Sequence, residues 1–568
     1  MIHIIPSVKT LEIKNGLLKR KSIFYNEDRY DSRLVTALSK LPRDSEGVAL
    51  DIQIVGDTEE EYELWIREES IEIQAGSTAG AFYAIQTLRQ IFKQNQVPCL
   101  YIKDRPDFKY RGFYHDITRG KVPTVATIKK LIEQMAYYKL NSLQLYVEHT
   151  FEFEEYKKLN EATGYLTAEE LKEIDAYCKE NFIEFIPSLS TFGHLYELLE
   201  QEEYKHLRVK KDFEKIPNFW YSRMKHHTID PTNSESIEII KSLIEQYAPH
   251  FTSDTFNICC DETFDLKVFD NMGYDSGKLY VGFVRQIIKH VRQTGKKVMM
   301  WADVLLHHPE VIDQIPEDIC FLNWDYWATP SEDNIMKFKE MGRTQIVCPA
   351  TWTWNRLCEN VDISEKNISL MAEYGFKHGA VGVLNTNWGD WGNPCSLELA
   401  MYGMVLGAEK SWSALTEVND EFYCSVNELL YENKNGIQYL KELSAMHELV
   451  NWTDICEMYL GNGIGEKIEF PRKEKYDIAK LQQAYCEFTD KLSGEKWGHD
   501  EFRQEMLLAA EGICVIGEML AIKDNEVIDR LTDTKKWLEK YSQMWMTKNK
   551  RSELYKIEEM FLNLSADE

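Results

Sequence analysis

Three patterns of apolar and polar residues follow one another along the chain, and each predicts a different kind of structure. Up to about residue 107, short β-rich pieces such as 48–55 and 62–66 alternate with turn residues. Residues 81–92 then carry apolar side chains at helical spacing, after a turn that contains two glycines. These features predict a small α+β domain over residues 1–107.

From residue 110 onward, an apolar run typical of a buried strand, a loop and a helical pattern repeat eight times. One helical pattern stops at Gly295, where a helix end favours left-handed backbone, and Thr167 with Glu170 forms a capping-box signal. The repeat predicts a (β/α)8 TIM barrel over residues 108–412. A doubly wound open sheet is the alternative, but no G-x-G-x-x-G or P-loop motif follows any of these strands. The predicted strands are 110–114, 142–147, 182–187, 255–260, 297–301, 319–324, 345–349 and 380–385.

After Trp412 the strand pattern disappears and helical spacing takes over. Two apolar stripes step by three and four residues, and they predict a C-terminal helical domain over residues 413–568. The fold class expected for the whole chain is therefore α/β, a TIM barrel between a small α+β domain and a helical domain. The stripes are Ile478, Leu481, Tyr485, Phe488 and Leu492, and Trp537, Leu538, Tyr541 and Trp545.

Charge and composition exclude some classes of binding partner and indicate a cellular location. The 568 residues carry a net charge of -27, with a pI near 5.1, which argues against nucleic acid or an anionic membrane as a partner. The first residues lack the long apolar core of a secretory leader, and no run of eighteen apolar residues occurs, so a cytoplasmic location is expected. The twelve cysteines include no C-x-x-C pair, which favours buried free thiols over disulfides or a zinc site.

One stretch carries the first candidates for catalysis. Residues 256–260 form an apolar run that ends in Asp261 and Glu262. Residues just past the carboxyl end of a barrel strand are where α/β barrels hold their catalytic groups, so these two carboxylates are the expected catalytic pair. Cys259 and Cys260, on opposite faces of the strand, are expected to pack the barrel.

The other strand ends add acids, a histidine and many tryptophans to the same mouth. Seven of the fourteen tryptophans fall on four consecutive strand ends. Flat aromatic faces stack well on pyranose rings, so the mouth is predicted to be a sugar pocket. The histidine pairs have no metal-ligand spacing, and no metal and no cofactor are expected. The first strand carries Arg111 and leads to Asp116 and Arg119. The later strand ends present Glu148, His194, Trp301, Asp303, Trp324, Tyr326, Trp327, Trp352, Trp354, Trp388, Asp390 and Trp391.

These residues resemble the landmarks of the glycoside hydrolase family 20 β-N-acetylhexosaminidases, in the family's order. The likeness covers roughly residues 48–412, and it rests on the following stretches: 110–120, 139–141, Gly193-His194, Asp261-Glu262 and 387–390, with 80–88 in the preceding small domain. The resemblance implies retaining hydrolysis in which the 2-acetamido group of the substrate is the nucleophile. Glu262 would then be the acid and base, and Asp261 would orient the acetamido group.

The resemblance also implies roles for the remaining residues. Arg111 and Asp390 would bind sugar hydroxyls, and Glu148 and His194 would support the acid. Trp301, Trp324 and Trp388 would wall the acetamido pocket. Two departures stand out: Glu148-His149 replaces an acid pair, and Trp352-Thr353-Trp354 stands where the family has a tyrosine that binds the acetamido oxygen, which leaves Tyr326 as a substitute.

Two alternatives stay open at this stage. One is a conventional retaining β-glycosidase with Asp303 or Asp390 as nucleophile, and the other is a carbohydrate-binding barrel without activity. The expected ligand in all three readings is a small glycan. The sequence does not decide between terminal GlcNAc and GalNAc, and a homodimer is one of the assemblies it leaves open.

Overall fold

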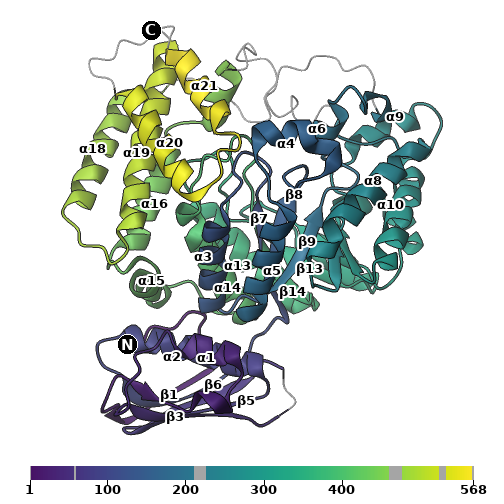
Figure 1. The fold of residues 1–568 in the computed structure, drawn as a ribbon. Helices are drawn as coiled ribbons and strands as arrows, with labels where there is room; N and C mark the ends of the chain where they lie inside the picture. The colour runs from purple at the N-terminus through teal and green to yellow at the C-terminus, as the bar shows by residue number, and fades with distance from the viewer. Residues whose placement is uncertain (1, 57–58, 210–225, 460–475, 524–531, 566–568) are drawn as a thin grey trace.

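The computed structural model describes residues 2–56, 59–209, 226–459, 476–523 and 532–565. Figure 1 shows a small sheet unit at the N-terminus, a barrel surrounded by helices, and a group of C-terminal helices along one flank of the barrel, with α15 (Asp420–Val426) close to the N-terminal unit. This is the fold class that the sequence predicts. The domain boundaries at residues 107 and 412 stay predictions.

The N-terminal unit is a six-stranded sheet, with strand order β1-β6-β4-β5-β3-β2, and helices α1 and α2. Alternation explains the sheet: Tyr62, Leu64 and Ile66 of β4 are buried, and the residues between them are partly exposed. The elements are β1 Thr10–Leu17, β2 Ile23–Phe24, α1 Ser32–Leu38, β3 Val48–Ile54, β4 Tyr62–Ile66, β5 Ser70–Ala75, α2 Thr78–Lys93 and β6 Pro98–Asp104.

Eight parallel strands close the barrel in the order β10-β11-β12-β13-β14-β7-β8-β9. Each overlaps one of the eight predicted strands, and two, β8 and β11, have the predicted bounds. Strand β10 ends earlier than expected, because Cys259 and Cys260 have left-handed backbone with φ of 56° and 66°. The strands are β7 Tyr110–Asp116, β8 Ser142–Val147, β9 Glu184–Leu189, β10 Thr255–Asn257, β11 Lys297–Trp301, β12 Cys320–Trp324, β13 Gln345–Cys348 and β14 Gly382–Asn387.

Helices alternate with these strands and cover the barrel (Figure 1). The predicted capping box is present, since Thr167 and Glu170 bond each other's backbone N–H groups, and Gly295 follows the end of α10 with φ of 82°. The helices are α3 Val125–Tyr137, α4 Lys157–Thr163, α5 Ala168–Glu180, α6 Tyr196–Leu199, α8 Ser234–Tyr247, α9 Lys267–Asp270, α10 Ser276–Gln293, α11 Asp303–His307, α12 Glu332–Glu340, α13 Val361–His378 and α14 Met401–Trp412.

A second hydrophobic cluster fills the barrel, separate from the larger core outside it. Cys259 belongs to this interior cluster and Cys260 to the outer core, so the two adjacent cysteines pack opposite faces as predicted. All twelve cysteines are free, and only Cys424 and Cys486 are exposed. The interior cluster contains Tyr114, Tyr146, Ile186, Cys259, Met299, Trp301, Leu322, Ile346, Cys348, Leu384 and Trp388.

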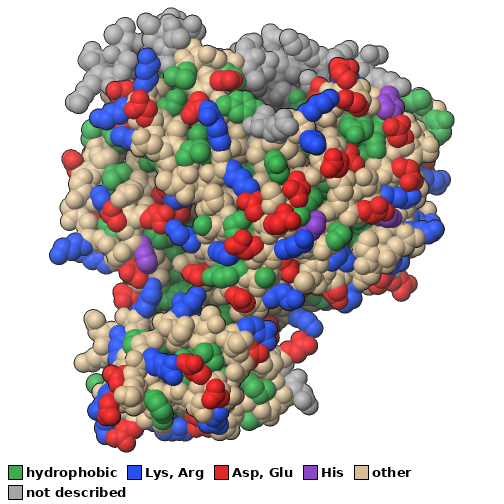
Figure 2. Space-filling model, viewed as in Figure 1, with side chains coloured by type: hydrophobic (Ala, Val, Ile, Leu, Met, Phe, Trp, Pro, Cys, Tyr) green, Lys and Arg blue, Asp and Glu red, His purple; other side chains and the backbone are tan. Residues whose placement is uncertain are grey.

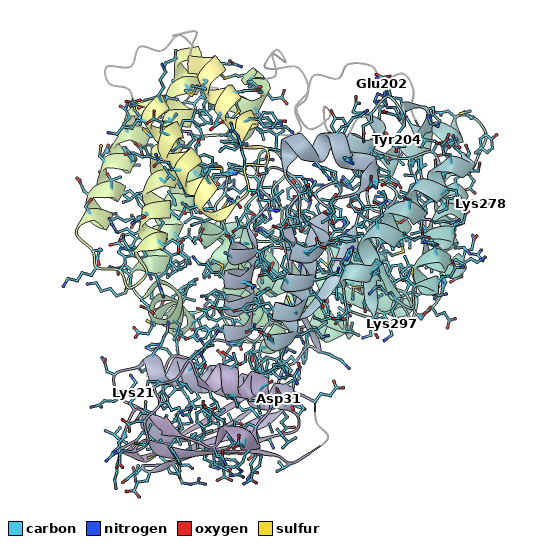
Figure 3. The ribbon with its side chains drawn as sticks, in the orientation of Figure 1. Lys21, Asp31, Glu202, Tyr204, Lys278 and Lys297 are labelled. Atoms are coloured by element: carbon cyan, nitrogen blue, oxygen red, sulfur yellow. The ribbon has the colours of Figure 1, made fainter. Side chains whose placement is uncertain are left out.

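The amino ends of the barrel strands face the N-terminal sheet. Lys297, the first residue of β11, is labelled at that end in Figure 3, whereas Glu202 and Tyr204, which come after β9, lie at the far end. The loops that follow the strands therefore open away from the sheet. On the face shown in Figure 2, acidic and basic side chains are mixed.

The C-terminal helices confirm the two predicted stripes, which are buried except for Tyr485. Their apolar residues belong to the same cluster as the outer core of the barrel, so they pack on the barrel. None of the helices that the structure describes is long and apolar enough to cross a membrane. The helices are α15 Asp420–Val426, α16 Gly436–His447, α17 Trp452–Tyr459, α18 Ile478–Ser493, α19 Asp500–Lys523, α20 Thr534–Lys548 and α21 Leu554–Ser565.

Candidate active site

A histidine next to two adjacent carboxylates forms the centre of the candidate site. His194 follows strand β9, and Asp261 and Glu262 follow β10. The Nε2 atom of His194 lies 3.1 Å from Oδ2 of Asp261 and 3.3 Å from Oε2 of Glu262. His194 is 3% exposed, whereas the side chain of Glu262 is 33% exposed. The structure thus brings together three residues that the sequence predicted, with Glu262 the most open to solvent.

The charges at this point favour a protonated histidine. Burial lowers the pKa of His194, but the carboxylates of Asp261 and Glu262 outweigh burial and raise the pKa to about 10. The backbone N–H of His194 donates to Nδ1 of His227 over 3.0 Å, which fixes the turn after β9. An imidazolium at this place holds both carboxylates by charge-assisted contacts.

The backbone around the two carboxylates is left-handed at several residues. The φ angles are 56° at His194, 56° at Cys259, 66° at Cys260 and 49° at Glu262. Such angles are costly for residues other than glycine, and they persist where the surrounding structure holds them. They turn the chain sharply at the end of β10 and place Asp261 and Glu262 side by side at the mouth.

Asp303, at the start of α11, holds the backbone of the acidic pair. Its Oδ2 atom accepts the backbone N–H of Glu262 over 2.9 Å. Burial and the nearby charge of Asp261 raise the pKa of Asp303 to about 7. The sequence placed Asp303 at the mouth as a candidate nucleophile, and the structure places it behind Glu262.

An arginine links the acid pair to the outer part of the mouth. Arg119 follows β7, and its Nη1 atom lies 3.2 Å from Oδ1 of Asp390, which follows β14. Its Nε atom lies 3.6 Å from Oε1 of Glu148, and its Nη2 atom lies 3.5 Å from Nδ1 of His194. The guanidinium also stacks over the ring of Trp388, 5.2 Å from its centre. Glu148 and His194, predicted as a pair, therefore share a contact with Arg119.

Arg111, which the sequence reading assigned to sugar binding, lies elsewhere, and that prediction is wrong. It is the second residue of β7, at the amino end of the barrel. Its side chain is fully buried, with Nη1 2.7 Å from Oε2 of Glu60 in the N-terminal unit and Nε donating to the carbonyl of Lys139. Arg119 occupies the mouth because it follows the same strand. The sequence signal that distinguishes the two arginines is their position relative to β7, because functional groups gather after the carboxyl end of a barrel strand and not at its start.

Aromatic residues line the mouth beside these charges. Trp301 and Trp388 lie 6.0 Å apart, and Tyr114 in the barrel interior contacts both. Trp324 stacks on Tyr326 at 4.9 Å, and Trp354 lies 5.7 Å from Tyr326. The structure therefore brings the predicted tryptophans into one aromatic wall. Trp352 extends it, 4.5 Å from Trp354.

Tyr326 places a hydroxyl within this wall. Its Oη atom accepts a hydrogen bond from Nε1 of Trp388 over 2.9 Å, and its backbone carbonyl accepts one from Nε1 of Trp352. Trp327, which is 62% exposed, lies at the outer end of the wall, 6.2 Å from Trp352. Trp391 lies outside the wall and packs toward Trp452 and Tyr459 of α17.

Family comparison decides the membership of the chain. Residues 108–374 match the model described as glycosyl hydrolase family 20, catalytic domain, and residues 1–105 match glycosyl hydrolase family 20, domain 2. The chain belongs to glycosyl hydrolase family 20. The catalytic match includes His194, Asp261, Glu262 and Arg119 and ends before β14, so it does not extend to Asp390.

Known family 20 proteins are distant relatives. A β-hexosaminidase of Porphyromonas gingivalis is 27% identical over 284 residues, which cover 44% of this chain and 36% of that protein. The matched part spans about a third of the length of the curated relatives matched first. The Vibrio harveyi exo β-N-acetylglucosaminidase shares the fold, with a TM-score of 0.60, 20% identity and 75% and 76% of the two chains covered. A Flavobacterium johnsoniae chitobiase also shares the fold, with a TM-score of 0.61, 16% identity and 99% of both chains covered.

The histidine and the two carboxylates at the centre of the site are close enough together to be considered as metal ligands. In the part of the chain that the structure describes, His194, Asp261 and Glu262 are the group whose ligand atoms lie close enough to share an ion. The carboxylates raise the pKa of His194 to about 10, so at neutral pH its Nε2 atom carries a proton in place of the lone pair that a metal requires. This donor set suits proton and hydrogen-bond chemistry better than metal binding.

Proposed function

We propose that this family 20 chain is a retaining exo-β-N-acetylhexosaminidase that removes terminal β-linked GlcNAc or GalNAc from small glycans. The observation that carries the proposal is the different surroundings of the two adjacent acids. Among the described residues, Oδ1 of Asp261 is buried and has no hydrogen-bond partner, whereas Glu262 faces solvent. A buried acceptor without a donor suits a substrate N–H, because an unpaired buried oxygen is costly until it is bound.

The chemistry follows from these two positions. The reacting form has Glu262 protonated and Asp261 as the carboxylate partner of His194. Glu262 gives its proton to the glycosidic oxygen while the carbonyl oxygen of the substrate's 2-acetamido group attacks the anomeric carbon, so the leaving group departs as an alcohol. Asp261 accepts the acetamido N–H and stabilises the positive charge that develops on the resulting oxazolinium ring. Glu262, now a carboxylate, then takes a proton from water as the water opens the ring, which returns the sugar with its original configuration.

The remaining groups fit binding roles around that reaction. The fork of Arg119 and the carboxylate of Asp390, 3.2 Å apart, offer donors and acceptors for the outer hydroxyls of the terminal sugar. Trp301, Trp324 and Trp388 provide apolar faces for the acetamido methyl group and the ring. The Tyr326 hydroxyl, which accepts from Trp388, would donate its own proton to the acetamido oxygen.

The alternative of a conventional two-carboxylate mechanism has less support. Asp390 is paired with Arg119, and Asp303 is bound to the backbone N–H of Glu262, so each candidate nucleophile already has a structural partner. A binding protein without activity has no need of an acid beside a buried imidazolium. The cytoplasmic location and a homodimer stay predictions.

Turnover of paired 4-nitrophenyl β-glycosides tests the proposal. GlcNAc and GalNAc substrates are compared with glucose and galactose substrates for the wild type and Asp261→Asn. The matched control is Asp254→Asn, an exposed carboxylate that precedes the same strand and pairs with Lys297. We expect strict dependence on the 2-acetamido group and a loss of about 10²- to 10³-fold in kcat for Asp261→Asn alone. Turnover of the plain sugars, or an active Asp261→Asn, would overturn the proposal.

A further inference from the structure

Two loops carry the outer binding residues, and both are attached to the C-terminal helices. The first loop, 117–124, contains Arg119 and runs beside the segment between α20 and α21. The backbone N–H of Lys550 donates to the carbonyl of Val122 over 2.8 Å, and that of Thr124 donates to the carbonyl of Lys548 over 3.0 Å. The N–H of Glu553 donates to the carbonyl of Gly120 over 3.1 Å. A segment more than 400 positions away thus completes the hydrogen bonding of this loop.

The second loop, 388–396, contains Asp390 and lies against α17, α20 and α21. The hydroxyl of Tyr541 donates to the carbonyl of Pro394 over 3.0 Å. At Gly392 a Cβ atom would lie 2.7 Å from Cδ1 of Ile557, so this part of the loop lies directly on the α21 side chain. Trp391 packs at 6.4 Å from both Trp452 and Tyr459.

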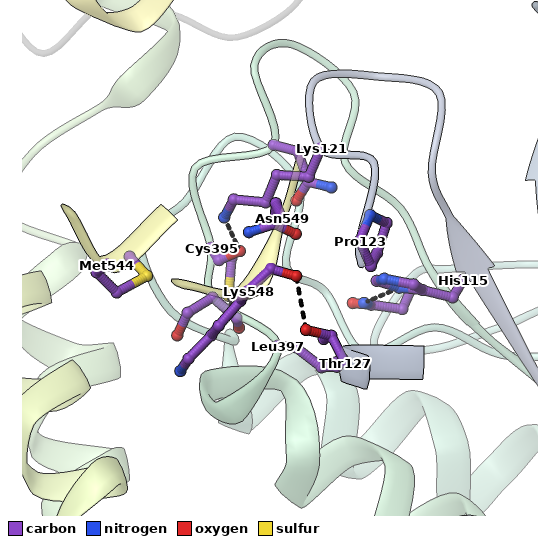
Figure 4. A pocket seen from close by; sticks show the side chains of 12 residues that line it. His115, Lys121, Pro123, Thr127, Cys395, Leu397, Met544, Lys548 and Asn549 are labelled. Carbon is purple, nitrogen blue, oxygen red and sulfur yellow. Dashed lines mark hydrogen bonds between the residues drawn. The ribbon is translucent and has the colours of Figure 1, made fainter. Parts of the chain in front are cut away.

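The two loops are also attached to each other, next to the same helices. The Nζ atom of the buried Lys121 donates to the carbonyl of Cys395 over 2.6 Å (Figure 4). The same atom lies 5.0 Å from the ring of Trp545. At Gly120 a Cβ atom would lie 2.6 Å from the carbonyl of Gly392. The cavity behind them, about 20 Å³, has room for one water molecule and not for a ligand.

The backbone of both loops needs such support. Asp390 and Asn393 have left-handed φ of 45°, and Gly120 and Gly392 have φ of 118° and 73°. A left-handed backbone is unfavourable for residues other than glycine and persists only where neighbouring structure fixes it. Here the C-terminal helices are that neighbouring structure.

We propose that the C-terminal helices are a positioning element of the active site, with Ile557 and Tyr541 holding the loop that presents Asp390 to Arg119. The inference rests on the proposed function, because it assigns these helices to binding of the terminal sugar. Both residues are buried against the loop, 0% and 2% exposed, so we assign them a positioning role and no direct contact with the substrate. Loosening the loop is expected to separate Asp390 from Arg119 and to weaken binding more than the chemical step.

The test uses the chain of 568 residues and four variants. Ile557→Ala removes the side chain under Gly392, Ile557→Val keeps most of its volume, and Tyr541→Phe removes only the hydroxyl. Leu492→Ala is the matched control, since Leu492 is a fully buried residue of α18 in the same helical region. The readouts are KM and kcat for 4-nitrophenyl β-GlcNAc, thermal stability, and hydrogen exchange of peptides 117–124 and 388–396 in the ligand-free protein.

We expect Ile557→Ala to raise KM by about tenfold and Tyr541→Phe by about threefold, with kcat within about threefold and faster exchange in both loops. Ile557→Val should resemble the wild type. Leu492→Ala should lower thermal stability without changing KM or loop exchange. Unchanged loop exchange and KM in Ile557→Ala, or equal effects in Leu492→Ala, would overturn the inference. Should the wild type not hydrolyse the substrate, the proposed function fails, and the exchange data alone decide whether the helices hold these loops.

Discussion

Replacing His194 with glutamine tests whether this residue is a buried imidazolium held by two carboxylates. Its Nε2 atom lies 3.1 Å from Asp261 and 3.3 Å from Glu262, and burial opposed by these charges raises its pKa from 6.5 to about 10. Each pKa unit corresponds to about 1.4 kcal/mol, so binding of this proton stabilises the folded state by roughly 5 kcal/mol. Glutamine keeps a donor of similar reach and removes the charge.

The sign of the pH dependence follows from the raised pKa. The folded protein binds the proton more tightly than the unfolded chain, so the stabilisation is complete below pH 6.5 and is lost as pH rises toward 10. We therefore expect the difference in free energy of unfolding between the wild type and His194→Gln to be several kcal/mol at about pH 6 and to shrink by up to roughly 5 kcal/mol by about pH 10.

Urea denaturation of both proteins at a series of pH values measures this difference. The matched control is His206→Gln, because His206 is 48% exposed and pairs with Glu235 at 2.8 Å on the surface. Its effect should stay within about 0.5 kcal/mol at every pH. A difference for His194→Gln that does not change between pH 6 and pH 10 would refute the reasoning, since it would mean that no proton is bound there by the carboxylates.

Three further predictions follow from the site. Arg119→Lys should lower kcat/KM by about 10- to 100-fold, because lysine lacks the planar guanidinium group. Arg111→Lys should instead reduce thermal stability and leave KM unchanged. The reverse pattern would contradict the placement of the two arginines. Tyr326→Phe should lower kcat for 2-acetamido substrates by about 10- to 100-fold, and an unchanged kcat would show that another group holds the acetamido oxygen. Burial and Asp261 raise the pKa of Asp303 from 3.8 to about 7, so the wild type should lose stability as pH rises between these values. Asp303→Asn should lack that loss of stability in urea titrations. If Asp303→Asn and the wild type had the same pH profile of stability, titration of Asp303 would be excluded as the cause.

Local patterns in the sequence determined the architecture. The eight barrel strands were recognisable because parallel strands buried on both faces are continuous apolar runs. The catalytic pair was recognisable because Asp261 and Glu262 end one of those runs. The stripe of Trp537, Tyr541 and Trp545 predicted a helix, since its spacing matches one helical face. Each of these signals lies within a few residues of chain.

Contacts between distant segments were decided by the tertiary structure alone. Arg111 and Arg119 are eight positions apart in the sequence, yet a strand of seven residues spans roughly 20 Å, so one lies under the barrel and the other in the mouth. The bond from Glu262 to Asp303 and that from Trp388 to Tyr326 join different strand ends. The support of the Asp390 loop by Ile557 joins residues more than 160 positions apart. Periodicity records which face of an element is buried, but the residue that a side chain meets depends on how the barrel closes and how the helices pack on it, and no local pattern records that.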